Sequence, residues 1–260
     1  MLTMPKKLLF SFFFLFLLSH HTRWASAQMA RLGVVKSSDN AGIWESIVGR
    51  LTAIGLDYCL IDSDRWQTVN DLGNIQVLLL PNVSQIQGYQ SESLANWLAQ
   101  GGKVIATGPT GELSTPDVKK QLQGLLGASW QFPNSQAISL KLNDNTEFVN
   151  LSVDGLTTPV SGGVLLPKLG AKTVAIWVSQ GKPAAIVSTN QTTFLGWRWG
   201  ANAVATPSFD LLWLQASLNR YGINAGTLNN QRPLQPTTIP TCNAGHQEPP
   251  TTPILPMSLN

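Results

Sequence analysis

The stretch Gly101–Ser114 (GGKVIATGPTGELS) has the residue pattern of a catalytic turn. A β-branched run, Lys103–Thr107, leads directly into the tight sequence Gly108-Pro-Thr-Gly111. In many enzymes built on a parallel sheet, a turn of this kind lifts a nucleophilic Ser or Cys above the end of a strand. Here the turn offers only the hydroxyl of Thr110, so chemistry at this position needs a base to activate that hydroxyl.

The sequence does not supply the usual base. A hydroxyl or thiol nucleophile is generally activated by a histidine within hydrogen-bond reach. The three histidines are His20 and His21, which precede the folded region, and His246, which lies in a Pro-rich tail. Cys59 falls inside an apolar strand pattern. We therefore predict a turn without a catalytic triad, in which Thr110 is a surface hydroxyl whose removal changes stability by no more than about 0.5 kcal/mol.

Phosphate and metal sites are also not predicted. The Gly-rich turn is not followed by the Gly-Lys-Ser/Thr sequence that completes a phosphate-binding loop. Cys and His residues do not recur at the spacing of a zinc site. The sequence thus predicts neither a cofactor nor a metal.

One enzymatic alternative rests on a pair of carboxylates. Asp39 and Glu112 both follow predicted strands, and the carboxyl ends of parallel strands meet at one edge of a sheet. Two carboxylates on either side of a glycosidic bond are what glycoside hydrolysis requires. The competing interpretation is that Asp39 caps a helix and Glu112 is a solvated loop residue, and we favour that interpretation.

Other polar and aromatic residues are candidate ligand contacts. At the same predicted edge these are Lys36, Ser38, Asn82 and Thr110. Trp197 and Trp199 alternate along a strand pattern, so both indoles lie on one face. Paired indoles can stack on sugar rings, but alternating aromatics next to a helix are more often core packing.

The region 31–127 alternates strand and helix patterns. Four apolar runs predict strands, and helix start and stop signals lie between them. The strand runs are Leu32–Val35, Asp57–Ile61, Gln76–Leu80 and Lys103–Thr107. Ser91 is predicted to cap the helix before Gly101, and Thr115 with Pro116 to open the next one. Strands that alternate with helices predict a parallel sheet covered on both faces.

Residues 128–200 change to strand patterns separated by turn residues, and the predicted strands are Ala137–Leu142, Phe148–Val153, Thr173–Ser179, Ala184–Thr189 and Thr193–Trp199. A last helix begins at Pro207 and Ser208 and ends at Gly222. We predict an antiparallel extension of the same sheet. The fold class is therefore α/β, with three layers, a mostly parallel sheet and an antiparallel β extension. With the motif GGKVIATGPTGELS quoted above, this sheet resembles the glutamine-amidotransferase or flavodoxin-like type. The domain is expected to span residues 28–222.

The N-terminus predicts export. Lys6 and Lys7 precede the 12-residue apolar run Leu8–Ser19, and Ala25-Ser-Ala27 has the form of a cleavage site. We expect residues 1–27 to be a signal peptide cut between Ala27 and Gln28, and the protein to be periplasmic or extracellular. Contact with a membrane is expected only if this segment stays uncleaved.

Charge and composition limit the classes of partner that the protein can bind. Without the leader the 17 basic residues fall to 14, against 14 acidic ones, so the mature chain is formally neutral. Nucleic-acid binding needs clustered basic residues, which are lacking, and we exclude it. Residues 223–260 contain seven prolines and predict a disordered tail or linker. Whether Cys59 and Cys242 pair is left open by the sequence.

The quoted motifs carry a resemblance. The segment NIQVLLLPNVSQI…SLANWLAQGGKVIATGPTGEL resembles a catalytically silent glutamine-amidotransferase-like fold, as in the trimerisation domain of family-42 β-galactosidases. The segments RLGVVKSSDNAGIW, DYCLID and GGKVIATGPTGELS are similar to the N-terminal domain of exported cyanobacterial proteins of the family-10-like glycosyl hydrolases. The likeness covers about residues 30–222 and is strongest in 31–130. In that family a hydrolase barrel follows this domain, and the present sequence ends where the barrel would begin.

The resemblance implies a non-catalytic binding or assembly module of an exported carbohydrate-active protein. Its partners would be a carbohydrate or a glycosyl-hydrolase domain, and a homo-oligomer is also implied. The alternative is an unrecognised glycoside hydrolase that uses Asp39 and Glu112.

Overall fold

The computed structural model describes residues 31–143, 148, 158–223 and 239–242. The predicted leader with its cleavage site at Ala27 and Gln28, and the predicted strand Phe148–Val153 beyond Phe148, lie outside these residues. Within the described part of the chain, no helix combines the length and apolar character needed to span a membrane.

The core of the fold is a sheet whose strands follow the order β2-β1-β3-β4-β10-β9-β7-β5. The first five strands of that order are mutually parallel. Their bounds are β1 Leu32–Lys36, β2 Tyr58–Asp62, β3 Val77–Pro81, β4 Lys103–Thr107 and β10 Thr192–Leu195. The four strands predicted in the first half of the chain are therefore confirmed within a residue or two at each end.

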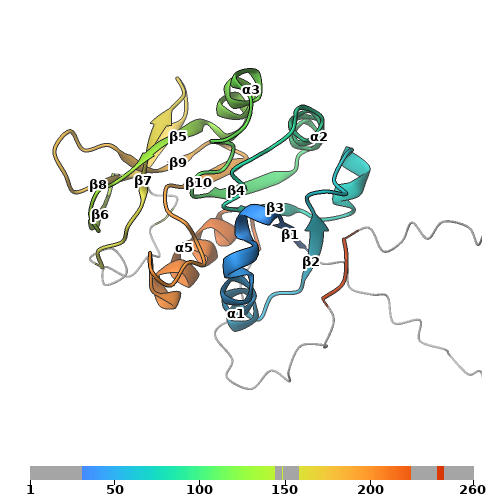
Figure 1. The fold of residues 1–260 in the computed structure, drawn as a ribbon, viewed down its shortest axis with the longest axis horizontal. Coiled ribbons are helices and arrows are strands. Elements are labelled where there is room, and N and C mark those ends of the chain that lie inside the picture. The colour runs from blue at the N-terminus through green and yellow to red at the C-terminus, as the bar shows by residue number, and fades with distance from the viewer. Residues whose placement is uncertain (1–30, 144–147, 149–157, 224–238, 243–260) are drawn as a thin grey trace, which may run out of the picture.

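Helices cover both faces of the sheet and make three layers (Figure 1). Alternate residues of β3 show the division: Val77 and Leu79 pack on one side, and Leu78 and Leu80 pack on the other. The first side carries α1 (Trp44–Ile54) and α5 (Pro207–Arg220), and the second carries α2 (Gly88–Ala99) and α3 (Pro116–Leu126). Two 3-10 helices, η1 (Ser38–Ile43) and η2 (Val69–Leu72), precede α1 and β3. The predicted three-layer α/β fold is confirmed.

An antiparallel extension continues the sheet beyond β10. Its strands are β5 Ala128–Pro133, β6 Leu140–Leu142, β7 Gly163–Pro167, β8 Lys172–Trp177 and β9 Ala184–Ser188. Strand β9 is antiparallel to β10, and both β7 and β8 pair with β9. We had predicted that the last strand of this region belongs to the antiparallel meander, but β10 also runs parallel to β4 and joins the two halves of the sheet.

Local signals explain most helix boundaries. Helix α3 begins with Thr115 and Pro116 as predicted, because Pro lacks the N–H that a first-turn position leaves unpaired. Thr206 caps α5 through a hydrogen bond from the Phe209 N–H. The cap predicted for α2 is wrong: Gln87 occupies that position, and Ser91 is buried inside the helix.

Part of the predicted tail lies against the sheet. Residues 239–242 form a short extended segment beside β2, shown in red in Figure 1. Cys242 in this segment forms a disulfide with Cys59 of β2, with Cα atoms 4.9 Å apart. The pairing that the sequence left open is thus present, and it joins two cysteines with a sequence separation of 183.

Candidate functional site

In the turn after β4, the position of Gly108 has no room for a side chain. Gly108 has φ +57° and its N–H donates to the carbonyl of Leu195. A Cβ added at Gly108 would lie 2.5 Å from Asn82 Oδ1 and 3.2 Å from the Cα of Arg198. The first distance is shorter than side-chain carbons adopt and the second is tight, so Gly108, the residue directly after β4, has no room for a nucleophilic side chain.

Asn82 is the residue that fills this space. It is fully buried and has φ +58°, a backbone conformation that Asn adopts more easily than most residues. Its Oδ1 accepts a hydrogen bond of 3.1 Å from the Thr107 hydroxyl, and its Nδ2 donates to the carbonyl of Trp199 at 2.8 Å. Asn82, a predicted ligand contact, instead joins β3 to the end of β4 and to the segment after β10.

Thr110 is also buried, which corrects our prediction of a surface hydroxyl. Its side chain is 4% exposed, and Oγ1 donates to the carbonyl of Thr107 at 2.7 Å. This hydroxyl already donates within the turn, and the described residues contain no histidine that could act as its base. Its role is to hold the turn in shape.

Asp39 and Glu112 lie on either side of the segment Val83–Gln85. Asp39 Oδ2 accepts a hydrogen bond of 3.1 Å from the N–H of Gln85. On the other side, the N–H groups flanking Glu112, those of Gly111 and Leu113, donate to the carbonyls of Val83 and Ser84, each at 2.9 Å. Both carboxylates are half-buried. One oxygen of Asp39 therefore has a structural role, but the predicted helix cap is wrong, because Asp39 lies inside η1 and Ser37 occupies the N-cap position.

Lys36 and Ser38 are the exposed members of the predicted set. Lys36 Nζ lies 5.5 Å from the ring centroid of Trp44, at the start of α1, which is a cation–π contact. Among the residues that the structure describes, no group of three or more His, Cys, Asp or Glu side chains is placed to hold a metal ion.

Trp197 and Trp199 are core residues, which confirms the core-packing interpretation and removes them from the candidate ligand contacts. Both are 0% exposed, so neither indole face is available to a sugar. The Trp197 N–H donates to Asp210 Oδ1 at 2.8 Å, and the Trp199 N–H donates to the Asp210 backbone carbonyl at 2.9 Å. The Trp197 ring meets Phe209 edge-on with centroids 5.2 Å apart.

Asp210, to which both indoles donate, belongs to a buried ion pair that the sequence did not predict. Arg50 Nε of α1 lies 2.7 Å from Asp210 Oδ2 of α5, and their side chains are 3% and 0% exposed. The Gly200 N–H donates to the same oxygen at 2.9 Å. Burial raises the pKa of Asp210 from its ordinary 3.8 to about 6, although the hydrogen bonds from Gly200 and Trp197 and the charge of Arg50 oppose that rise.

Arg50 also fastens the loop after β10 to α1. Its Nη2 donates to Asn202 Oδ1 at 3.0 Å and to the carbonyl of Ala205 at 3.3 Å, and its Nη1 donates to Ser46 Oγ. A signal for this pair was present in the sequence: Arg50 interrupts the apolar face of Ile47, Leu51 and Ile54. Which carboxylate it meets, however, depends on contacts 160 positions away.

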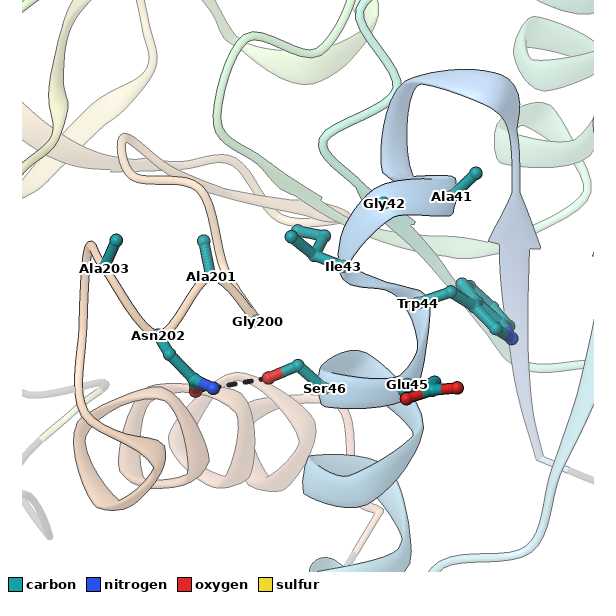
Figure 2. Close-up of a pocket in the computed structure, with 10 residues that line it drawn as sticks. All are labelled: Ala41, Gly42, Ile43, Trp44, Glu45, Ser46, Gly200, Ala201, Asn202 and Ala203. Atoms are coloured by element: carbon teal, nitrogen blue, oxygen red, sulfur yellow. Dashed lines mark hydrogen bonds between the residues drawn. The ribbon is translucent and has the colours of Figure 1, made fainter.

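Above this network lies an open groove of about 770 Å³ between residues 41–46 and 200–203. Its lining is mostly small side chains with three polar ones: Ala41, Gly42, Ile43, Trp44, Glu45, Ser46, Gly200, Ala201, Asn202 and Ala203. Figure 2 shows Ser46 and Asn202 joined by a hydrogen bond of 3.2 Å, while Trp44 points away from the 200–203 loop. The groove follows the ends of β1 and β10, at the edge where open parallel sheets bind ligands.

Comparison with solved structures identifies the fold. The chain is similar to the cold-adapted β-galactosidase of Rahnella sp. R3, with a TM-score of 0.57 and 15% identity over 75% of this chain and 31% of that one. It is similar to a GH42 β-galactosidase of G. stearothermophilus, with a TM-score of 0.56 and 10% identity over 76% of this chain and 31% of that one. A ThuA-like protein of Bacteroides uniformis has a TM-score of 0.57 at 11% identity, over 75% of this chain and 93% of that one.

These matches show a shared fold. The chain spans about a third of the length of the β-galactosidases it matches. No family model matches the sequence, and no curated protein matches it either.

Proposed function

We propose that this chain is a non-catalytic binding or assembly module of an exported, carbohydrate-active system. The observation that carries the proposal is the closed turn after β4. Gly108 has no space for a side chain because Asn82 Oδ1 occupies it. Thr110, the turn's hydroxyl, is buried and already hydrogen-bonded.

The structural neighbours support the carbohydrate-active setting. Several are named as β-galactosidases, and one as an α-L-fucosidase from Paenibacillus thiaminolyticus, with a TM-score of 0.56 and 15% identity over 74% of this chain and 33% of that one. Because the match covers only a third of each enzyme, it favours an accessory domain such as the trimerisation domain that the sequence resembles. The match over 93% of the ThuA-like protein indicates that the fold also occurs as nearly a whole chain.

Export is supported by the disulfide. Structural disulfides persist mainly in oxidising compartments such as the periplasm or the extracellular space. The Cys59–Cys242 bond fits the signal peptide predicted for residues 1–27, with cleavage between Ala27 and Gln28.

The groove between residues 41–46 and 200–203 is the binding surface in this proposal. Asn202, Ser46 and Glu45 supply amide, hydroxyl and carboxylate groups of the kind that hydrogen-bond sugar hydroxyls, and the small residues leave a ring room to enter. Assembly with a glycosyl-hydrolase domain or with further copies of the chain is the other mode.

The test uses oxidised residues 28–260. Binding of neutral oligosaccharides is measured by titration calorimetry, and the mass in solution is measured by light scattering. We expect saturable binding or a defined oligomer, together with no turnover of chromogenic glycosides. Ala203→Trp should abolish binding by filling the groove, whereas Ala99→Trp, at an exposed position on α2, should not. Turnover of any glycoside, or a monomer without binding, overturns the proposal.

A further inference from the structure

The side-chain amide of Asn202, in the groove between residues 41–46 and 200–203, is held in one orientation by a buried cation. Its Oδ1 accepts a hydrogen bond of 3.0 Å from Arg50 Nη2 and one of 3.2 Å from the Ser46 hydroxyl. Arg50 is 3% exposed, and a guanidinium has N–H donors and no acceptor. Turning the amide over would set its N–H groups against those of Arg50, so the oxygen is the atom that faces Arg50.

This orientation leaves the nitrogen of the amide as the group that Asn202 offers to the groove. Among the residues that the structure describes, none accepts a hydrogen bond from Nδ2, and Asn202 is an exposed member of the groove lining. The Ser46 hydroxyl, by contrast, accepts from Arg50 Nη1 and gives its hydrogen to Asn202, so it has none left for a ligand. Asn202 therefore presents two N–H donors, and a ligand must bring an acceptor to them.

The lining around Asn202 is small and apolar. The facing segment 41–43 and the rest of the 200–203 loop contribute Ala41, Gly42, Ile43, Gly200, Ala201 and Ala203. Trp44, the one aromatic residue of this lining, points away from the loop (Figure 2), so its ring is not placed to stack on a sugar inside the groove. A pair of amide donors among methyl groups suits a short acyl group better than the bare face of a sugar ring.

The charges around the groove favour a neutral acceptor over an anionic one. Glu45 is a carboxylate in the lining, which contains no Lys or Arg. The charge of Arg50 is balanced by Asp210, whose Oδ2 lies 2.7 Å from Arg50 Nε. An anionic ligand would meet an acidic side chain and no unpaired cation in this lining, whereas a carbonyl oxygen accepts from Asn202 without that repulsion.

We propose that the groove recognises the acetamido group of an N-acetylated sugar, and that Asn202 determines this specificity. The acetamido carbonyl accepts from Asn202 Nδ2, and the acetamido methyl packs against the side chains of Ala201 and Ala203. A sugar hydroxyl at the same ring position is shorter and carries no methyl group, so it loses the apolar contact. This inference rests on the proposed function, because it narrows the carbohydrate ligand to an N-acetylated one.

The test compares two neutral tetrasaccharides that share their ring type and linkage. They are N-acetylated chitotetraose and cellotetraose, which differ only in carrying an acetamido group or a hydroxyl on each ring. Titration calorimetry of oxidised residues 28–260 should give a dissociation constant at least about tenfold lower for chitotetraose. Equal affinity for the two overturns this inference and leaves the proposed function standing. Binding of neither removes the groove from the proposed function, and this inference with it.

The matched variant is Asn202→Asp. An aspartate keeps the oxygen that faces Arg50 and Ser46 and loses only the N–H groups, so the variant should bind chitotetraose at least about tenfold more weakly at a melting temperature close to that of the parent. Asn190→Asp, at an exposed position between β9 and β10, adds the same charge away from the groove and should leave the affinity unchanged. Unchanged affinity in Asn202→Asp overturns the role of Asn202.

Two further measurements keep the inference testable. If Asn202→Asp does not fold, the side-chain amide signals of Asn202 in an NMR spectrum of the parent decide, because they should shift with chitotetraose and not with the same concentration of cellotetraose. Absence of that shift overturns the inference. An N-acetylated alanine dipeptide carries the acetamido group without a sugar, and binding as tight as that of chitotetraose would show that the ligand is a peptide and overturn the sugar.

Discussion

Two regions at the carboxyl edge of the sheet differ in how they use buried polar groups. After β4, the carboxamide of Asn82 fills the space beside Gly108, so no side chain fits at that position. Between α1 and residues 200–203, the buried pair Arg50–Asp210 instead holds the 200–203 loop against α1, and an open groove lies between the loop and the helix. The turn after β4, which has the sequence pattern of a catalytic turn, has no space for a nucleophilic side chain at Gly108. The groove between residues 41–46 and 200–203 is open, although no sequence motif marks it. A sequence motif and an open groove are therefore independent indications of a functional site.

The largest expected effect comes from breaking the ion pair. Arg50→Met keeps most of the side-chain volume but leaves Asp210 buried without a charged partner, which should lower the free energy of unfolding by about 3–5 kcal/mol at pH 8. Urea denaturation measures it. Arg65→Met is the control, because Arg65 is 84% exposed and its contact with Asp62 is 3.8 Å long. A loss below about 1 kcal/mol for Arg50→Met would show that the pair does not support the loop.

The pH dependence of the free energy of unfolding also tests the role of the buried Asp210. Because burial raises the pKa of Asp210 to about 6, the folded chain holds a proton between pH 4 and 6 that the unfolded chain has released. The stability that this group contributes is therefore complete below about pH 4 and is lost as the pH rises through 6, by an amount on the order of 3 kcal/mol. Unfolding measured across this range should show the decline in the parent and a flatter profile in Asp210→Asn. If the free energy of unfolding falls equally with pH in the parent and in Asp210→Asn, the decline does not come from Asp210.

At the closed turn, Gly108→Ala should cost about 2–3 kcal/mol. Its Cβ would meet Asn82 Oδ1 at 2.5 Å, in addition to the backbone strain of φ +57°. Gly101→Ala is the matched control: Gly101 also has positive φ, but an added Cβ has nothing within 4 Å, so only the backbone strain of about 1 kcal/mol remains. The difference between the two melting temperatures measures how tightly the turn is filled, and no difference would mean that it is not.

The smallest expected effect is that of Thr110→Ala. Because the hydroxyl is buried and donates to the Thr107 carbonyl, its loss should cost about 1 kcal/mol, above the limit of about 0.5 kcal/mol that a surface position predicts. Thermal denaturation resolves the two values. The Thr110→Ser variant, which keeps the hydroxyl, should lie between the parent and Thr110→Ala.

The parallel half of the sheet could be predicted from the sequence because its signals are local. Each of its first four strands is a run of apolar residues, and Gly55 ends α1 in the left-handed conformation that a glycine there predicts. Strand β5 gave no such signal, since its residues SWQF are half-buried or exposed at the sheet edge. Strand β7 was missed as well, and its pairing with β5 depends on distant partners.

The candidate site was harder to predict for the same reason. The polar residues after the strands were correctly expected to gather at one edge, but whether each is exposed depends on its neighbours in the fold. Asn82 and Trp199 meet across 117 positions, and both are fully buried. Arg50 and Asp210 meet across 160 positions. Spacing within a short motif carries no information about such pairs.

The central proposal is that this chain is non-catalytic, and a turnover assay tests it most directly. Oxidised residues 28–260 are assayed against glycoside, ester and amide substrates beside the double variant Asp39→Asn/Glu112→Gln and beside Thr110→Ala. The account predicts that the parent and both variants stay at the uncatalysed rate. Turnover of any of these substrates by the parent contradicts it, and loss of that activity in a variant whose melting temperature and secondary structure stay close to those of the parent would locate the chemistry at the substituted residues.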